Sequence, residues 1–157
     1  MISDFIEQRI TAQLPFTPNE QQTRLIHLLA LFTTSNTDDR LFLLRGYAGT
    51  GKTSLVSALI RAMSELQQPT VLLAPTGRAA KVLASYSGHA AHTIHKQIYR
   101  QQSMGAAAFS LAPNMKKDTL FIVDEASMIA NTPGDNSMFG TGCLLDDLIH
   151  YVYSGTG

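Results

Sequence analysis

The stretch from residue 45 to residue 56, RGYAGTGKTSLV, places three glycines and one lysine between an apolar run and a segment of helical character. Its central part, residues 46–53, fits the spacing G-x-x-x-x-G-K-[ST]. Glycines allow a backbone to turn several N–H groups inward, and a helix that follows adds its positive end. A lysine beside such a turn places its positive charge near the same anion. The stretch therefore predicts a loop that binds a polyphosphate.

The residue types in this loop assign a role to most positions. Lys52 is expected to reach the β- and γ-phosphates of ATP, and the Thr53 hydroxyl to ligate Mg²⁺. The residues expected to contact the nucleotide are Gly46, Ala48, Gly49, Thr50, Gly51, Lys52, Thr53 and Ser54. An accidental glycine-rich turn is the alternative, and a strand before the loop with a helix after it disfavours that alternative.

Composition limits which classes of protein and which partners remain possible. The chain has 157 residues, 45% hydrophobic and 15% charged, which is typical of a globular domain with a core. Twelve basic residues balance twelve acidic ones, so any nucleic-acid site must be local. The single cysteine, Cys143, excludes an internal disulfide and favours a cytoplasmic location. No apolar run reaches transmembrane length, and we expect no membrane partner.

Apolar periodicity and turn residues predict the order of elements. Asn19 is the expected N-cap of a helix, with Gln22 at the third helical position. The predicted helices cover 3–13, 20–32, 51–66, 78–87, 92–100 and 143–153, the last with Leu144, Leu145, Leu148 and Val152 on one face. The predicted strands cover 40–46, 70–77 and 119–126, with a loop or small hairpin over 101–118 and a flexible loop over 131–142.

Apolar strands that alternate with helices indicate an α/β fold with a mainly parallel sheet. Ligands of such sheets bind at the carboxyl ends of the strands. The polar signatures at 46–53, 74–77 and 124–127 all fall at predicted strand ends. The fold class expected is therefore a three-layer P-loop NTPase domain.

The strand end at Asp124 and Glu125 carries two adjacent carboxylates. In P-loop enzymes such an aspartate holds the Mg²⁺ shell, and a neighbouring glutamate can polarise the attacking water. A solvated strand end is the alternative, and two adjacent acids alone do not decide between them. In a chain that also has the phosphate loop, the pair favours hydrolysis of ATP by water. Lys52, Asp124 and Glu125 are then the expected catalytic residues.

Four segments, GYAGTGKTSLV (46–56), APTGRAAKVLA (74–84), TIHKQIY (93–99) and IVDEASMI (122–129), occur in this order. Together they resemble the first motor domain of superfamily 1 DNA helicases, and most closely the RecD-like group, which includes Dda-type enzymes. The resemblance covers residues 16–153. It implies a RecA-like ATPase fold and ATP-driven five-prime to three-prime translocation on single-stranded DNA. The α subunit of exodeoxyribonuclease V is one such relative, and DNA repair is the implied process.

The resemblance also carries over individual roles. It implies that Thr76, Gly77, Thr93 and His95 contact DNA, and that a glutamine at the start of the helix after Asn19 reads adenine. Gln22 is preferred for that position because the apolar offsets after it match, and Gln21 remains a rival. Residues 101–118 correspond to a hairpin that splits the duplex in relatives, although this segment is short.

Other polar features have weaker interpretations. His89, His92 and His95 are spaced by three, but neither a thiolate nor a carboxylate cluster lies nearby, so we expect no structural metal. Five basic residues can form a local strip or a solvated surface: Lys81, Lys96, Arg100, Lys116 and Lys117.

The resembled helicases contain a second RecA-like domain, which closes over ATP and supplies an arginine. Their next motif, a strand that ends in Gly-Asp-x-x-Gln, does not follow the last predicted helix, because the sequence stops at YVYSGTG. We therefore expect residues 1–157 to be one truncated RecA-like domain. It should bind Mg·ATP, hydrolyse it hardly at all, bind single-stranded DNA weakly and not unwind a duplex. A small P-loop kinase and a catalytically silent nucleotide-binding module remain as alternatives.

Overall fold

The computed structural model describes residues 1–47, 49–105, 108–131 and 138–155. The chain divides into two compact units, Met1–Pro69 and Thr70–Gly157. The first unit is helical, and the second combines helices with a parallel sheet. The α/β class and the parallel sheet expected from the sequence are therefore confirmed.

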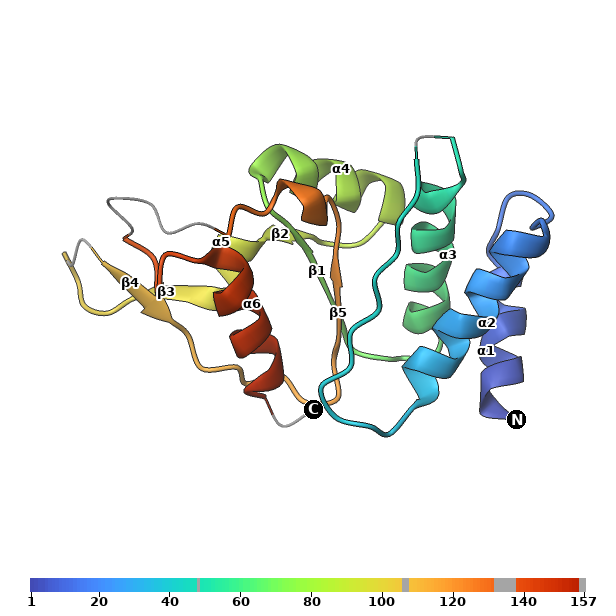
Figure 1. Ribbon diagram of the computed structural model, residues 1–157, viewed down its shortest axis with the longest axis horizontal. Coiled ribbons are helices and arrows are strands. Elements are labelled where there is room, and N and C mark those ends of the chain that lie inside the picture. Colours follow the sequence, from blue (N-terminus) through green and yellow to red (C-terminus); the bar gives the residue numbers. More distant parts are fainter. Residues whose placement is uncertain (48, 106–107, 132–137, 156–157) are drawn as a thin grey trace. The chain divides into compact units, whose positions relative to one another are not determined.

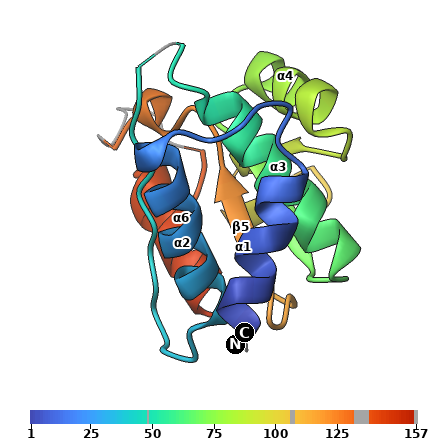
Figure 2. The same ribbon diagram turned by 90° about the vertical axis from the view of Figure 1, so that its right-hand side faces the viewer.

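Three helices form the first unit: α1 (Ile2–Ala12), α2 (Glu20–Thr34) and α3 (Lys52–Glu65). Helix α1 packs against both α2 and α3 (Figures 1 and 2). Each helix buries an apolar stripe, as in Ile6 and Ile10 of α1, Ile26 and Leu29 of α2, and Leu55 of α3. These three helices agree with the predicted ranges to within two residues.

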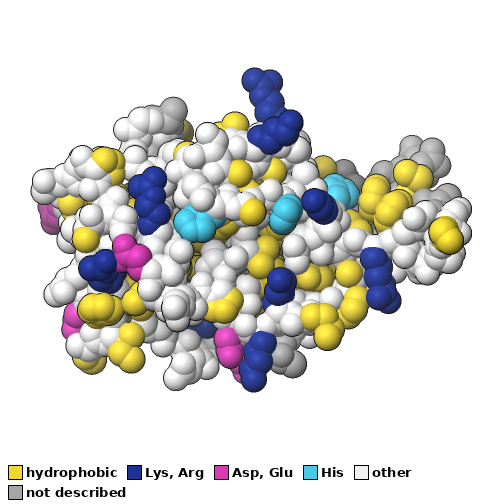
Figure 3. Space-filling model, turned by 180° about the vertical axis from the view of Figure 1, so that it is seen from behind, with side chains coloured by type: hydrophobic (Ala, Val, Ile, Leu, Met, Phe, Trp, Pro, Cys, Tyr) yellow, Lys and Arg dark blue, Asp and Glu magenta, His cyan; other side chains and the backbone are white. Residues whose placement is uncertain are grey.

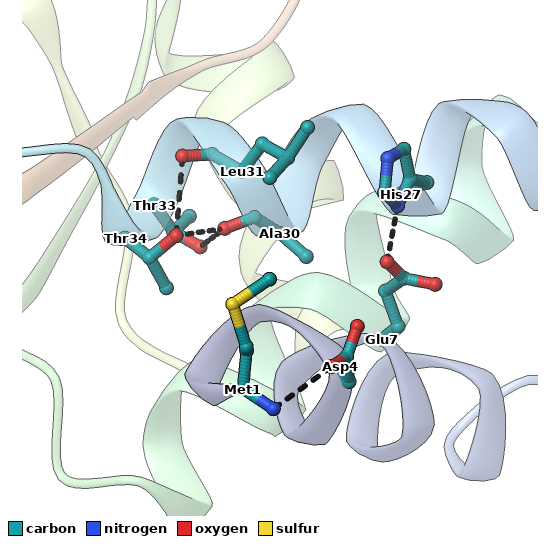
Figure 4. A network of polar contacts seen from close by, with 8 residues as sticks. All are labelled: Met1, Asp4, Glu7, His27, Ala30, Leu31, Thr33 and Thr34. Atoms are coloured by element: carbon teal, nitrogen blue, oxygen red, sulfur yellow. Dashed lines mark hydrogen bonds and ion pairs between the residues drawn. The ribbon is translucent and has the colours of Figure 1, made fainter.

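Polar side chains fix both the start and the end of α2. Asn19 accepts a hydrogen bond from the Gln22 N–H at 2.9 Å, and the Gln22 side chain accepts one from the Asn19 N–H at 2.9 Å. This reciprocal pair is the predicted capping box, and it satisfies two N–H groups that the helix leaves open. At the other end, the Thr33 and Thr34 hydroxyls donate to the Ala30 carbonyl at 3.0 and 2.9 Å (Figure 4).

Charged side chains join the helices of the first unit. Glu7 of α1 pairs with His27 of α2 (Figure 4). Near the other end of α1, the Arg9 Nε atom donates to the Glu65 carboxylate of α3 at 3.0 Å. Exposed pairs of this kind each contribute about 0–1 kcal/mol to the free energy of unfolding. They therefore affect the relative orientation of the helices more than the stability of the unit.

The strand predicted for residues 40–46 is wrong: this segment joins no ladder among the described residues. Leu41 and Leu43 are 75% and 69% exposed. The reason is that an apolar run indicates only that a segment suits a sheet. A strand also needs a neighbouring backbone to receive its N–H and C=O groups, and local sequence does not supply one.

A three-stranded parallel sheet forms the centre of the second unit. Strand β1 (Thr70–Ala74) lies between β2 (His92–Thr93) and β5 (Leu120–Val123) (Figure 1). Thr70 pairs with Leu120 and Leu73 with Val123, so β1 and β5 end at the same edge. Helix α4 (Gly77–Ser87) follows β1 and packs against it. Both long strands agree with the sequence prediction, although each ends earlier.

The helix predicted for residues 92–100 is also wrong in extent. The segment contains β2, a short helix α5 (Ile94–Ile98) and strand β3 (Tyr99–Gln101). Thr93 caps α5 through the Lys96 N–H at 3.2 Å, and Tyr99 leaves the helix to pair with Leu111. Strand β3 and β4 (Phe109–Leu111) are antiparallel, so the small hairpin expected over 101–118 forms but begins at Tyr99.

The core of the second unit includes the last helix. Helix α6 (Leu144–Tyr153) buries Asp147, Leu148 and Tyr151, whereas Leu144, Leu145 and Val152 of its predicted face are only half-buried. Leu148 and Tyr151 join a cluster whose other buried members are Leu73, Ile94, Ile98 and Tyr99. A one-turn 3-10 helix, η1 (Ala126–Met128), follows β5. Residues 132–137 of the predicted loop over 131–142 lie outside the described residues.

In the part of the chain that the structure describes, no helix is both long and apolar enough to cross a membrane. The described residues also contain no group of three His, Cys, Asp or Glu side chains that could hold a metal ion.

Candidate nucleotide and DNA site

The predicted phosphate loop runs into the N-terminus of α3. Lys52 is the first helical residue, and Gly51 before it has a φ of 81°. A turn precedes it, in which the Thr50 N–H and hydroxyl donate to the Tyr47 carbonyl at 3.3 and 2.7 Å. A glycine N-cap brings no side-chain acceptor to the first turn, so the helix terminus is suited to an external anion.

Close approach, as well as conformation, requires glycine in this loop. A Cβ atom built on Gly51 would lie 2.9 Å from the Gln22 Nε2 atom and 3.3 Å from the Phe16 ring. A Cβ atom on Gly46 would lie 2.9 Å from the Thr50 hydroxyl. The loop is thus folded tightly on its own atoms and on the start of α2. Ala48, which was also expected to contact nucleotide, lies outside the described residues.

The lysine of the loop folds back over it. The Lys52 Nζ atom donates to the Gly46 carbonyl at 3.4 Å, and the side chain is half-buried. Thr53 is exposed in the first turn of α3, and Ser54 after it is half-buried. The loop therefore fits a phosphate group, because it combines a helix N-terminus with a flexible ammonium group.

Gln22 links the start of α2 to the phosphate loop. Its Nε2 atom donates to the Thr50 carbonyl at 3.1 Å, while its Oε1 atom completes the capping box. Gln21, the rival for adenine recognition, is exposed, and Gln22 is half-buried. Of the two glutamines, Gln22 is the one whose amide bonds the loop. Adenine recognition itself stays a prediction.

In the second unit, the carboxyl ends of β1 and β5 lie side by side. The Asp124 N–H donates to the Leu73 carbonyl at 3.0 Å, which extends the ladder by one residue. The chain then leaves the sheet at Glu125, whose φ is 54°, in the left-handed region. Non-glycine residues in this region are uncommon, and they often occur at functional sites.

The Asp124 carboxylate accepts two hydrogen bonds within the described residues. The Glu125 N–H donates to Oδ1 at 2.9 Å, and the Tyr86 hydroxyl of α4 donates to Oδ2 at 2.8 Å. Burial, and then this hydrogen bond, raise the pKa of Tyr86, so its hydroxyl stays protonated. Because an ionised carboxylate has about four lone-pair positions, Asp124 can still accept from the water shell of Mg²⁺. Glu125 is exposed.

Two residues predicted to contact DNA are helix caps. The Thr76 hydroxyl accepts from the Ala79 N–H at 3.1 Å at the start of α4, and Thr93 caps α5. Gly77 is the first residue of α4 and is exposed. A cap does not exclude a phosphate contact, because the other N–H groups of a helix terminus bind phosphates. The DNA contacts stay predictions.

His95 lies within an aromatic group rather than in open solvent. Its ring is 4.9 Å from the Phe139 ring and 5.5 Å from the Tyr99 ring, centre to centre. Burial lowers the pKa of His95, so the neutral imidazole is favoured. A neutral half-buried ring can stack on a base, whereas it would contribute little charge to a phosphate contact.

The five residues of the possible basic strip are all exposed. On the face drawn in Figure 3, Lys and Arg side chains are dispersed among uncharged and hydrophobic groups. The exposure of all five residues is what a solvated surface shows, and the strip stays a prediction.

Sequence reasoning missed two tyrosine–aspartate pairs, Tyr86–Asp124 and Tyr99–Asp147. The Tyr99 hydroxyl donates to the Asp147 Oδ2 atom at 2.5 Å, and Thr141 donates to both Asp147 oxygens from its N–H and hydroxyl. The sequence contains only a weak indication of these pairs. A tyrosine beside a buried helical stripe needs a partner for its hydroxyl, but the sequence does not say which one.

A glycine-rich loop at the start of a helix, in a chain with a parallel sheet whose strand end carries two carboxylates, is the pattern of a P-loop domain. Residues 18–136 match the family model for the AAA domain, and the chain belongs to this family.

Two known proteins are similar to it over part of their length. The chain is 36% identical over 103 residues, 61% of its length, to the multifunctional conjugation protein TraI of Escherichia coli (strain K12). It is 36% identical over 93 residues, 59% of its length, to the ATP-dependent RecD2 DNA helicase of Deinococcus radiodurans. These matches confirm the resemblance to the N-terminal ATPase domain of RecD-like superfamily 1 helicases. The matched segments span only 6% and 12% of those proteins.

Proposed function

We propose that this domain binds Mg·ATP and serves as the ATP-binding motor domain of a five-prime to three-prime DNA helicase. The observation that carries the proposal is the phosphate loop, in which Gly51 is the N-cap of α3 and Lys52, the first helical residue, folds back over Gly46. The similarity to a RecD2 DNA helicase supports single-stranded DNA as the polymer along which the whole protein moves.

The proposed division of roles follows the chemistry of each side chain. The loop N–H groups and Lys52 hold the phosphates, and the Gln22 amide meets the adenine. The Thr53 hydroxyl is proposed to ligate Mg²⁺, and Asp124 to hold the water shell of the ion. When bound, Mg²⁺ offsets the negative charge of the phosphates. Glu125, exposed after the strand end, orients the attacking water.

Residues 1–157 by themselves are proposed to turn ATP over slowly. Charge that develops on the transferred phosphoryl group needs a further cation, and the resemblance places that arginine on a second motor domain. Such an arginine is typically worth about 10³–10⁵ in rate. Unwinding needs two domains that move against each other, so this domain alone should not unwind DNA. It should bind single-stranded DNA weakly, with an affinity that falls as salt rises.

Calorimetric titration with ATP and Mg²⁺ tests the proposal. Lys52→Ala should weaken ATP binding at least about tenfold, because it removes a charge-assisted contact. The melting temperature should stay within about 2 °C, since the described Lys52 side chain bonds only the Gly46 carbonyl. Lys81→Ala, an exposed lysine of α4, is the matched control and should bind like the unchanged chain. Equal ATP affinity in all three proteins would refute the nucleotide site.

A further inference from the structure

Tyr86 reaches the proposed Mg²⁺-serving carboxylate from a different element. It lies on α4, and its hydroxyl is 2.8 Å from the Asp124 Oδ2 atom at the end of β5. Both side chains are half-buried. The backbone of Asp124 is itself fixed by the Leu73 carbonyl of β1. Three elements of the second unit therefore determine where this carboxylate lies.

The two donors hold the two oxygens of Asp124 separately. The Glu125 N–H binds Oδ1 and comes from the adjacent residue, so it cannot fix the carboxylate alone against rotation. The Tyr86 hydroxyl binds Oδ2 and comes from 38 residues away in the sequence. Together they fix the plane of the carboxylate, and each oxygen keeps a second lone pair for another partner.

The second tyrosine–aspartate pair of this unit shows the contrast. Asp147 is 3% exposed and accepts from Tyr99, the Thr141 N–H and the Thr141 hydroxyl, all within the described residues. Three donors and burial leave Asp147 with little capacity for an outside ligand. Asp124 has two donors and remains half-buried. The tyrosine hydrogen bond at Asp147 thus belongs to a buried, fully bonded carboxylate. The tyrosine hydrogen bond at Asp124 belongs to a carboxylate that can still accept from a ligand.

We propose that Tyr86 is a positioning residue, which fixes the Asp124 carboxylate in the orientation that receives the water shell of Mg²⁺. The inference rests on the proposed function. Partners that orient a metal-binding side chain typically change metal affinity about 10–100-fold when they are removed. Because Tyr86 is one of two donors, we expect the lower end of this range. The proposed function assigns phosphate binding to the loop at residues 46–53, and Tyr86 is not part of that loop.

The test measures ATP affinity of the full chain by calorimetry, first in EDTA and then at increasing Mg²⁺ concentration. The unchanged protein should bind ATP more tightly as Mg²⁺ is added. Tyr86→Phe should keep the EDTA affinity within about twofold and shift the Mg²⁺ midpoint about tenfold higher. Tyr99→Phe, which removes the corresponding hydroxyl from Asp147, is the matched control. It should lower the melting temperature and leave the Mg²⁺ midpoint unchanged.

A double-variant cycle separates positioning from a general loss of structure. Asp124→Asn should weaken the Mg²⁺ effect, and adding Tyr86→Phe to it should cause no further change, because the two act through one carboxylate. Binding stoichiometry in EDTA reports the folded fraction of every variant, so partial unfolding is detected directly.

The outcomes distinguish the two proposals. An unchanged chain that shows no Mg²⁺-dependent ATP binding would overturn the proposed function and the role of Tyr86 with it. A normal unchanged chain with an equal Mg²⁺ midpoint in Tyr86→Phe would overturn the role of Tyr86 alone. Additive effects in the double variant would also overturn that role.

Discussion

Replacing Gly51 with alanine tests how the phosphate loop is built, and it should lower the free energy of unfolding by about 2–3 kcal/mol. Gly51 has a φ of 81°, where an L-residue costs about 1–2 kcal/mol. The new Cβ atom would also stand 2.9 Å from the Gln22 Nε2 atom. The Gln22 amide must then leave the Thr50 carbonyl, which costs about 1 kcal/mol more.

Gly49→Ala is the matched control for this substitution. Its φ of 82° is almost the same, so the backbone cost is the same. A Cβ atom on Gly49 would meet no described atom within 4 Å, so the contact cost is absent. We therefore expect about 1–2 kcal/mol for Gly49→Ala, and a difference of about 1 kcal/mol between the two variants.

Urea unfolding of both variants measures this difference directly. Introducing Gly51→Ala into a Gln22→Ala background gives a second measurement, because the amide that the Cβ atom approaches is then absent. In that background the cost of Gly51→Ala should fall toward the value for Gly49→Ala, because the Phe16 ring, 3.3 Å from the Cβ atom, is then the only close contact left among the described residues. If Gly49→Ala destabilises as much as Gly51→Ala, or the Gln22→Ala background gives no relief, the close approach does not govern this loop.

Three further predictions concern a helix cap, a buried acid and a histidine. Asn19→Ala should lower the free energy of unfolding by about 1 kcal/mol in urea, because it removes the cap of α2. Asp147→Ala should cost about 3 kcal/mol by the same assay, since the buried Tyr99 hydroxyl loses its acceptor, whereas the exposed neighbour Asp146→Ala should cost less than about 0.5 kcal/mol. Burial lowers the pKa of His95 below its ordinary 6.5, so the unfolded chain binds the proton more readily. Stability should therefore decrease as pH falls through about 6.5, and the decrease should be smaller in His95→Gln.

The elements that the sequence predicted well are those with local causes. The Asn19 cap and its partner Gln22 are three residues apart, and the structure forms both hydrogen bonds. Helix α4 begins one residue before its predicted start at residue 78, directly after Thr76, whose hydroxyl caps it. Such features depend on a few neighbouring side chains, so their spacing alone is sufficient to predict them.

The failures have a different physical origin. The run at residues 40–46 has the composition of a buried strand, yet it joins no ladder in the described chain. The segment 92–100 contains helix-forming residues, but Tyr99 extends into β3, where it pairs with Leu111. In both places the outcome depends on which backbone lies alongside, and intrinsic preference does not encode that.

The candidate site also combines features with local causes and features that depend on distant parts of the chain. There the distant contacts orient the groups proposed to bind nucleotide and Mg²⁺. Motif spacing predicts the phosphate loop and Asp124 because each motif lies within a few residues. The contacts that orient those groups join distant parts of the chain: Gln22 meets Thr50 28 residues later, and Tyr86 meets Asp124 38 residues later. A motif therefore predicts which groups do the chemistry, while the side chains that hold them in place become visible only when α2 and α4 are seen packed beside them. Substitutions at Gln22 and Tyr86 should consequently alter nucleotide and Mg²⁺ binding although neither residue belongs to the loop or to the acidic pair.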